Sequence, residues 1–378
     1  MPIMRHGVLA FAMFLLLAPA GRAAEPPKAW QFAPESLRPF WRSDTMHGES
    51  VLFLQEAPGG TPRASLLMPP KRILELRSPD GATAYREGRD YVWKPGERQI
   101  TLPPGSQIAF YKPADLRRPA KSQPYALTHR DGNGEIRFGA GHEYHDMQVT
   151  VTYQFDPAAW TGPRPSFAEK QLPRAIERLR AKQPLTIALL GDSISTGCNA
   201  SGWAGAAPFQ PPYQDLLVRC LEAHYKAPVT LKNFAVGGTD TGWGLANLDK
   251  VIQAEPHLVI LAFGMNDSAG RPAADYQANI RQMIDRVQKA RPEAEFILIA
   301  SMLGNRDWVT LHHDLFPQYR DALAALCRPG VVMADMTMLW DELLKHKKDA
   351  DLTGNGVNHP NDFGHRLYAQ TLSALLMP

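Results

Sequence analysis

The sequence of 378 residues contains very little cysteine. Its three cysteines are Cys198, Cys220 and Cys327, an odd number that permits at most one disulfide. Small disulfide-rich scaffolds are therefore excluded, and we expect buried free thiols. No C-x-x-C spacing of the kind that binds metals occurs anywhere in the chain. The sequence thus predicts neither a metal site nor a cofactor.

The chain also has almost no excess of positive over negative charge. The formal net charge is only +3, and part of it comes from arginines near the N-terminus. Proteins that bind nucleic acid or anionic membranes usually carry a much stronger basic excess. We therefore predict no nucleic-acid partner.

Long hydrophobic runs are absent except at the start of the chain, where residues 7–18 are apolar. About a dozen residues fall short of the roughly 20 that span a bilayer. Arg5 and His6 precede the run and small residues follow it, a pattern typical of a bacterial secretory signal peptide cleaved after Ala23. No cysteine lies near the cleavage region. We expect a periplasmic or secreted protein with no stable membrane anchor.

The chain divides into segments of different character after this signal peptide (residues 1–23). Residues 24–156 contain short runs of Val, Ile, Tyr and Phe separated by Pro-Gly, Asp-Gly and Gly-Ser, which predicts an antiparallel β-sandwich of jelly-roll type. Residues 157–184 begin with a proline-rich stretch and end with a helical pattern, which predicts a linker and a short helix. The remaining residues, 185–378, form a third segment.

That third segment alternates apolar runs with helical stretches. The runs are LTIALL, VTLKNFAV, HLVILAFG, EFILIASM and VVMADM, and the helices are expected near 212–226, 242–254, 273–290 and 314–327. Runs that are apolar on both faces are typical of a parallel sheet covered by helices on both sides. The fold class predicted is therefore α/β, with a β-sandwich in front.

Polar residues and glycines follow several of these runs. Ser193 follows the first run, Gly238 the second and Asn266 the third, while His359 precedes a helix near the C-terminus. In an open α/β sheet, ligands bind outside the carboxyl ends of the strands, so these four residues are expected to converge there.

This combination of residues suits acyl transfer, which needs a nucleophile, a base and donors for the developing oxyanion. We predict that Ser193 attacks and that His359 accepts its proton. The backbone amides of Ser193 and Gly238, with the side chain of Asn266, would form the oxyanion hole. A glycine at 238 would let the backbone approach the substrate closely.

The residues of these motifs and their order along the chain, beginning with GDSIS at 191–195, resemble those of the SGNH or GDSL hydrolase family. The resemblance covers the chain from about Thr186 to the C-terminus. The resemblance implies a flavodoxin-like three-layer α/β/α catalytic domain, a metal-independent serine hydrolase mechanism and ester substrates. With its preceding β-sandwich, the chain also resembles two-domain carbohydrate acetyl esterases of this superfamily.

One position departs from the family pattern. Members usually carry an aspartate three residues before the catalytic histidine, and here Gly356 stands at that position. The imidazole still needs a partner that fixes its tautomer. Asn355, Asp351, Asp349 or a backbone carbonyl could serve, and the sequence leaves all four open.

Three other sequence features are weaker evidence for function: a pair of histidines, two glycosylation patterns and a group of aromatic residues. GHEYHD at 141–146 could suggest a metal site, but on a strand His142 and His145 would point to opposite faces. Asn199-Ala200-Ser201 and Asn266-Asp267-Ser268 match the glycosylation pattern. The long loop after Ser193 carries the aromatic residues Trp203, Phe209 and Tyr213, and the loop after the second run carries Trp243. These side chains could form an apolar wall or a sugar-stacking platform near the serine, or they could simply pack the loop.

The function predicted from the sequence is that of an exported serine esterase that removes short acyl groups, above all O-acetyl groups, from a carbohydrate. Its partner would be a small-molecule or polysaccharide ester. Two alternatives stay open: a lysophospholipase or thioesterase of the same family, and a glycan-binding protein that has lost catalytic activity.

Overall fold

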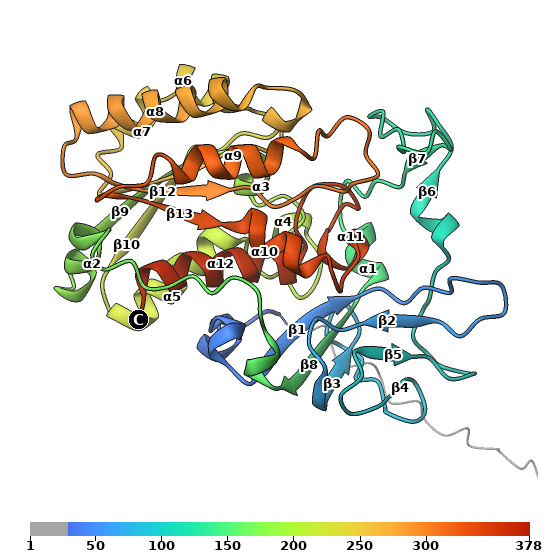
Figure 1. Ribbon diagram of the computed structural model, residues 1–378. Helices are drawn as coiled ribbons and strands as arrows, with labels where there is room; N and C mark the ends of the chain where they lie inside the picture. Colours follow the sequence, from blue (N-terminus) through green and yellow to red (C-terminus); the bar gives the residue numbers. More distant parts are fainter. Residues whose placement is uncertain (1–28) are drawn as a thin grey trace, which may run out of the picture.

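A five-stranded parallel sheet lies at the centre of the protein in the computed structural model, which describes residues 29–378 (Figure 1). The spatial order of its strands is β10-β9-β11-β12-β13. Chain order therefore reverses between β9 and β11, as in flavodoxin-like folds. The predicted apolar runs form these strands: β9 (Leu185–Gly191), β10 (Val229–Asn233), β11 (Leu258–Ala262), β12 (Glu295–Ala300) and β13 (Val331–Asp335).

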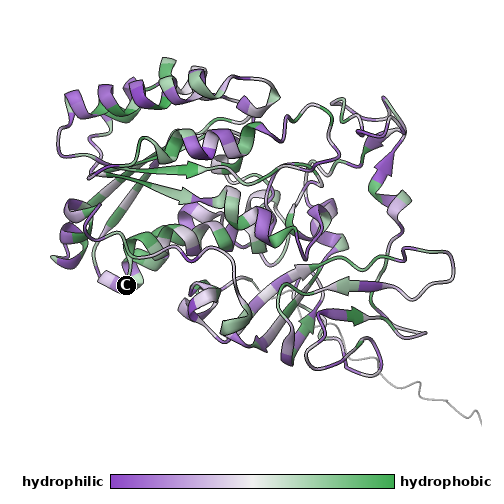
Figure 2. Ribbon diagram, viewed as in Figure 1, coloured by the Kyte–Doolittle hydropathy of each residue, from purple (hydrophilic) through white to green (hydrophobic). Residues whose placement is uncertain are grey.

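Helices cover both faces of this sheet. Successive residues of β9 point to opposite faces, so that Leu189 joins the core under α5 and α12 while Leu190 joins the core under α8 and α9. In Figure 2 the strands are mostly hydrophobic, whereas the covering helices carry hydrophilic residues along their length. The helices that enclose the sheet are α5 (Tyr213–Tyr225), α6 (Thr241–Ala246), α7 (Asp249–Gln253), α8 (Ala273–Ala290), α9 (Leu315–Ala324), α10 (Met336–Leu343) and α12 (Asp362–Leu376).

The N-terminal part consists mainly of short antiparallel strands, which we call the N-terminal β region (residues 45–155). One sheet has the order β1-β8-β3 and a second has the order β2-β5-β4. The prediction of an α/β/α domain preceded by a β domain is thus confirmed. The strands are β1 (Thr45–Val51), β2 (Arg63–Ser65), β3 (Pro70–Arg77), β4 (Val92–Trp93), β5 (Gln99–Thr101) and β8 (Val149–Phe155).

A projection of the β region, residues 113–141, reaches over to the α/β domain, and we call it the arm. It contains the two-stranded pair β6 (Arg117–Arg118) and β7 (Glu135–Ile136), which lies apart from the other strands in Figure 1. The Arg130 backbone N–H donates to the Asp307 carbonyl at 2.7 Å, and the Val309 N–H donates to the Thr128 carbonyl at 3.1 Å. The arm is therefore fixed to the loop that follows β12.

Short helices complete the structure. Residues 141–146, expected on a strand, instead lead into helix α1 (Glu143–Met147), on whose exposed side His142 and Asp146 pair at 2.7 Å. The helix expected at 242–254 is divided into α6 and α7. The other short elements are η1 (Pro34–Leu37), η2 (Phe40–Arg42), η3 (Pro113–Leu116), η4 (Pro157–Ala159), α2 (Pro173–Arg180), α3 (Ser193–Thr196), α4 (Ser201–Ala204), η5 (Asp267–Ala269) and α11 (Asp349–Leu352).

Further features of the described residues concern the cysteines, the segment before β1 and the hydropathy of the helices. All three cysteines are free, as expected, but Cys327 is exposed rather than buried. Residues 34–42, which precede the β region, pack against the α/β domain: the Arg42 guanidinium donates to the carbonyl of Met377 at 3.3 Å. None of the helices within residues 29–378 is long and apolar enough to cross a membrane. The predicted signal peptide lies outside the described residues.

Candidate active site

Ser193 stands where the chain leaves β9 and turns into α3. Asp192 caps this helix, since its carboxylate oxygen accepts a hydrogen bond from the Ile194 N–H at 3.0 Å. Ser193 is therefore the first helical residue and is only 7% exposed. The turn aims its hydroxyl at the carboxyl edge of the sheet, where the sequence predicted a nucleophile.

His359 reaches the serine from the loop between α11 and α12. Its Nε2 lies 2.9 Å from the Ser193 hydroxyl oxygen. Burial, with a smaller contribution from His365, lowers the pKa of His359 to about 3. The imidazole is therefore neutral over the physiological range and can accept the serine proton.

The partner of the other ring nitrogen is a residue that the sequence analysis did not assign to catalysis. His359 Nδ1 lies 2.7 Å from the side-chain oxygen of Asn199. The Asn199 side-chain nitrogen donates to the carbonyls of Gly141 at 2.7 Å and Gly354 at 3.2 Å, so its oxygen must be the atom that faces the ring. An oxygen can only accept, so the proton resides on Nδ1 and Nε2 is left as the acceptor.

None of the four groups that the sequence left open is the partner of a ring nitrogen, since Asn199 and Ser193 occupy both. The Asn355 side-chain oxygen accepts from the backbone N–H groups of Val357 at 2.9 Å and His359 at 3.2 Å, which shapes the loop and leaves the ring untouched. Asp351 accepts from the Leu52 N–H at 2.8 Å. A backbone carbonyl is not needed either, since side chains occupy both ring nitrogens.

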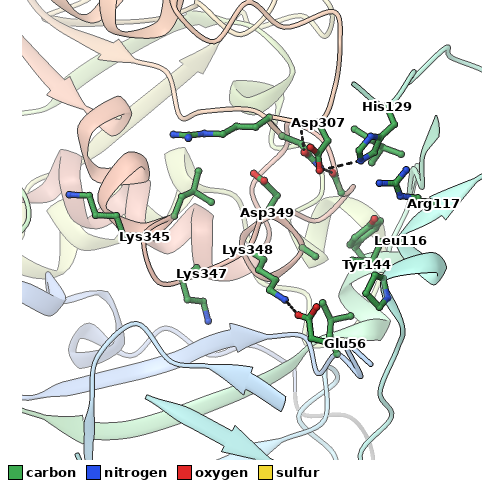
Figure 3. A pocket seen from close by; sticks show the side chains of 18 of the residues that line it. Glu56, Leu116, Arg117, His129, Tyr144, Asp307, Lys345, Lys347, Lys348 and Asp349 are labelled. Atoms are coloured by element: carbon green, nitrogen blue, oxygen red, sulfur yellow. Dashed lines mark hydrogen bonds and ion pairs between the residues drawn. The ribbon is translucent and has the colours of Figure 1, made fainter. Parts of the chain in front are cut away.

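The fourth predicted group, Asp349, faces a different cavity, shown in Figure 3. This cavity measures about 540 Å³ and lies between the arm and the segment that joins α10 to α11. Tyr144 and Gly356 line it, but Ser193 and His359 do not. Burial raises the pKa of Asp349 to about 7, and one of its carboxylate oxygens is buried without a hydrogen-bond partner within the described residues.

The predicted oxyanion donors lie on two loops beside the serine. A side-chain N–H of Asn266 donates to the Thr239 carbonyl at 2.8 Å, which ties Asn266 to the loop of Gly238 and leaves its second N–H available. Gly238 has φ +77°, and a Cβ there would have no atom within 4 Å. Glycine is thus required by a left-handed backbone rather than by lack of space, which refines the prediction. A Cβ on the neighbouring Gly237 would lie 3.7 Å from that of Ser193.

Other predicted features do not gather at this site. Tyr213 is buried and its hydroxyl contacts Ser195 at 2.7 Å, and Trp243 packs against the core, so the aromatic residues of the loops form no common wall. Trp203 and Phe209 are exposed. His145 contacts the Ala207 carbonyl, whereas His142 pairs with Asp146, and residues 29–378 contain no group of three or more His, Cys, Asp or Glu side chains placed to hold a metal ion. Asn199 is 4% exposed, so it is inaccessible to glycosylation.

The α/β part of the chain matches a known protein family. Residues 189–367 match the model of the GDSL-like Lipase/Acylhydrolase family, and the match contains all four predicted site residues. The α/β part of the chain is therefore a GDSL-like lipase/acylhydrolase domain, which belongs to a family of enzymes that hydrolyse ester bonds. A search of curated proteins found no match.

Solved structures with similar folds include three esterases or lipases. A two-domain esterase active on acetylated mannans is 20% identical, with a TM-score of 0.43, and the match covers 56% of this chain and 54% of that structure. An acetylxylan esterase from Geobacillus stearothermophilus is 19% identical, with a TM-score of 0.42, over 50% of this chain and 92% of that one. A lipase from a goat rumen metagenome is 17% identical, with a TM-score of 0.41, over 50% and 96%. The chain thus spans about half the length of the first of these.

Proposed function

We propose that this protein is a serine esterase that removes short acyl groups, above all acetyl, from a carbohydrate in the periplasm or outside the cell. The observation that carries the proposal is the contact of 2.9 Å between His359 Nε2 and the Ser193 hydroxyl. A neutral imidazole with a fixed tautomer beside a serine at a helix start is equipped for nucleophilic catalysis.

The reaction proceeds through an acyl-enzyme. The Ser193 oxygen bonds to the ester carbonyl carbon while its proton moves to His359 Nε2, and the carbonyl oxygen becomes an oxyanion facing Gly238 and Asn266. The carbon–oxygen bond to the alcohol then breaks, and the alcohol takes the proton from Nε2. Water, deprotonated by His359, attacks the acyl group, and the carboxylic acid leaves with Ser193 restored.

A carbohydrate substrate is supported by the openness of the site. Gly237 and Gly238 are exposed, and His359 is half-buried, so a bulky alcohol can remain outside while its acyl group reaches Ser193. The predicted signal peptide would place the enzyme where polysaccharides are met. Fractionation of the producing cells tests that location.

Hydrolysis of p-nitrophenyl esters of increasing chain length, together with acetate release from acetylated mannan and xylan, tests the proposal. We expect acetate to be the preferred acyl group and acetate to be released from at least one polymer. Preference for long chains would favour a lysophospholipase or thioesterase. No turnover of any ester would favour a glycan-binding protein, and either result would overturn the proposal.

A further inference from the structure

The N-terminal β region touches the catalytic loops through its backbone. The arm ends in a bend, residues 139–141, that lies against the loop of His359: the Gly139 N–H donates to the Asn355 carbonyl at 3.1 Å. The carbonyls of the same bend face Asn199, whose side-chain nitrogen lies 2.7 Å from the Gly141 oxygen and 3.4 Å from the Gly139 oxygen. Two of the three carbonyls that surround the Asn199 amide therefore come from the β region.

The bend is in turn held by the helix that follows it. The Glu143 carboxylate accepts a hydrogen bond from the Gly141 N–H at 2.8 Å. The next residue, Tyr144, is 1% exposed, and its hydroxyl donates to the Arg137 carbonyl at 3.1 Å. Helix α1 thus closes the bend and fixes an aromatic ring beside it.

That ring explains why residue 356 is glycine. Gly356 has φ +80°, and a Cβ at this position would lie 2.3 Å from the ring and hydroxyl of Tyr144. Real Cβ atoms do not approach other atoms so closely, and the left-handed backbone disfavours other residues as well. An aspartate at 356, where the resemblance to the SGNH family expects one, cannot coexist with Tyr144 in this position.

We propose that the β region forms part of the active site. Tyr144 occupies the space that the usual carboxylate would need, and the Gly139–Gly141 bend holds Asn199. Asn199 then serves, instead of a carboxylate, as the positioning residue for His359. This inference deepens the proposed function and rests on it. Asn199 fixes the ring without adding a negative charge, and no carboxylate counteracts the lowering of the pKa of His359.

The first test replaces Asn199. In Asn199→Ala the ring loses its acceptor, and we expect kcat for p-nitrophenyl acetate to fall on the order of 10²-fold with little change in KM, since the loss acts on proton transfer. In Asn199→Asp an ionised carboxylate would face the Gly141 and Gly354 carbonyls, whereas a protonated one could still donate to one of them. We therefore expect activity only on the acid side of the pH profile, falling as pH rises.

The second test addresses the β region itself. Glu143→Ala removes the bond that holds the bend, and we expect kcat to fall by about 2- to 10-fold, the equivalent of one ordinary hydrogen bond. Asp146→Ala is the matched control, because Asp146 is exposed on the same helix and its carboxylate pairs with the exposed His142 rather than with the bend. It should keep the activity of the unmodified protein. Equal activity of the two variants would overturn the role of the β region.

A readout independent of turnover separates this inference from the proposed function. Nitrogen-15 NMR of His359 should show the proton on Nδ1 in the unmodified protein and a changed tautomer or pKa in Asn199→Ala. If no ester is hydrolysed but this change occurs, the proposed function fails and the positioning role stands. If the spectrum and kcat are both unaffected by Asn199→Ala, the positioning role is wrong.

Discussion

The α/β domain and the N-terminal β region contribute to the candidate site in different ways. The α/β domain supplies side chains, with Ser193, Asn266 and His359 following or flanking elements of its sheet. The β region supplies backbone carbonyls at 139 and 141 and the ring of Tyr144. Reactive groups can therefore be recognised by residue type, whereas the backbone carbonyls that hold Asn199 could have been supplied by almost any sequence with the same backbone.

The two regions are also joined by buried polar contacts. Lys347, which follows α10, forms an ion pair with Glu49 of β1 at 2.6 Å, and both side chains are fully buried. Lys347 also donates to the carbonyls of Ser50 and Ser65. One continuous hydrophobic core includes residues of β1, β8, α5 and α12. The β region is thus built into the α/β domain rather than attached beside it.

The largest effect is expected from Ser193→Ala, which tests whether reactive groups reside only in the α/β domain. Removing the attacking oxygen should lower kcat by about 10³-fold or more. The melting temperature should stay the same, because the change leaves Asp192 to cap α3. Near-native turnover by this variant would mean that Ser193 only turns the chain.

The second largest effect is expected for the buried ion pair that joins the β region to the α/β domain. Lys347→Met leaves Glu49 buried without its partner and should lower the free energy of unfolding by about 3–5 kcal/mol in urea denaturation. The double variant with Glu49→Gln should regain part of that loss. Lys348→Met is the control, since its pair with Glu56 is exposed and should contribute at most about 1 kcal/mol. Two separate unfolding transitions in the unmodified protein would contradict the conclusion that the β region is built into the α/β domain.

The next effect concerns the oxyanion hole. Asn266→Ala should lower kcat by roughly 10²- to 10³-fold with little change in KM, since the donor acts mainly on the transition state. Steady-state kinetics with p-nitrophenyl acetate measure both constants. A rise in KM at constant kcat would instead assign Asn266 to substrate binding.

The smallest effect is expected for Asp349→Asn. The pKa of Asp349 is raised in the folded protein, so the unfolded chain ionises first and stability is lost as pH rises from about 4 to about 7. Removing the ionisable group should raise the melting temperature more at pH 8 than at pH 4, with unchanged activity. Asp341→Asn, an exposed carboxylate of the same cavity, should show no such difference. Loss of kcat in Asp349→Asn would restore Asp349 as a partner of His359.

Much of the fold could be predicted because its signals are local. Each parallel strand is a short apolar run between helical patterns, and Ser193, Gly238 and Asn266 follow such runs directly. The helix at 143–147 was missed because five residues are too few to show helical periodicity. Asn199 was noticed only as a glycosylation match, since nothing in its neighbourhood indicates that a ring 160 positions away will contact it.

The sequence by itself determined the parallel sheet and the nucleophile, base and oxyanion donors proposed for its carboxyl edge, because these depend on hydrophobic periodicity and on chemistry carried by single side chains. Only the tertiary structure decided what orients His359, why residue 356 is glycine, and that the β region reaches the active site. Those outcomes depend on which backbone carbonyls and which ring come within 2–4 Å of one another, and such distances arise only when segments far apart in the chain pack together.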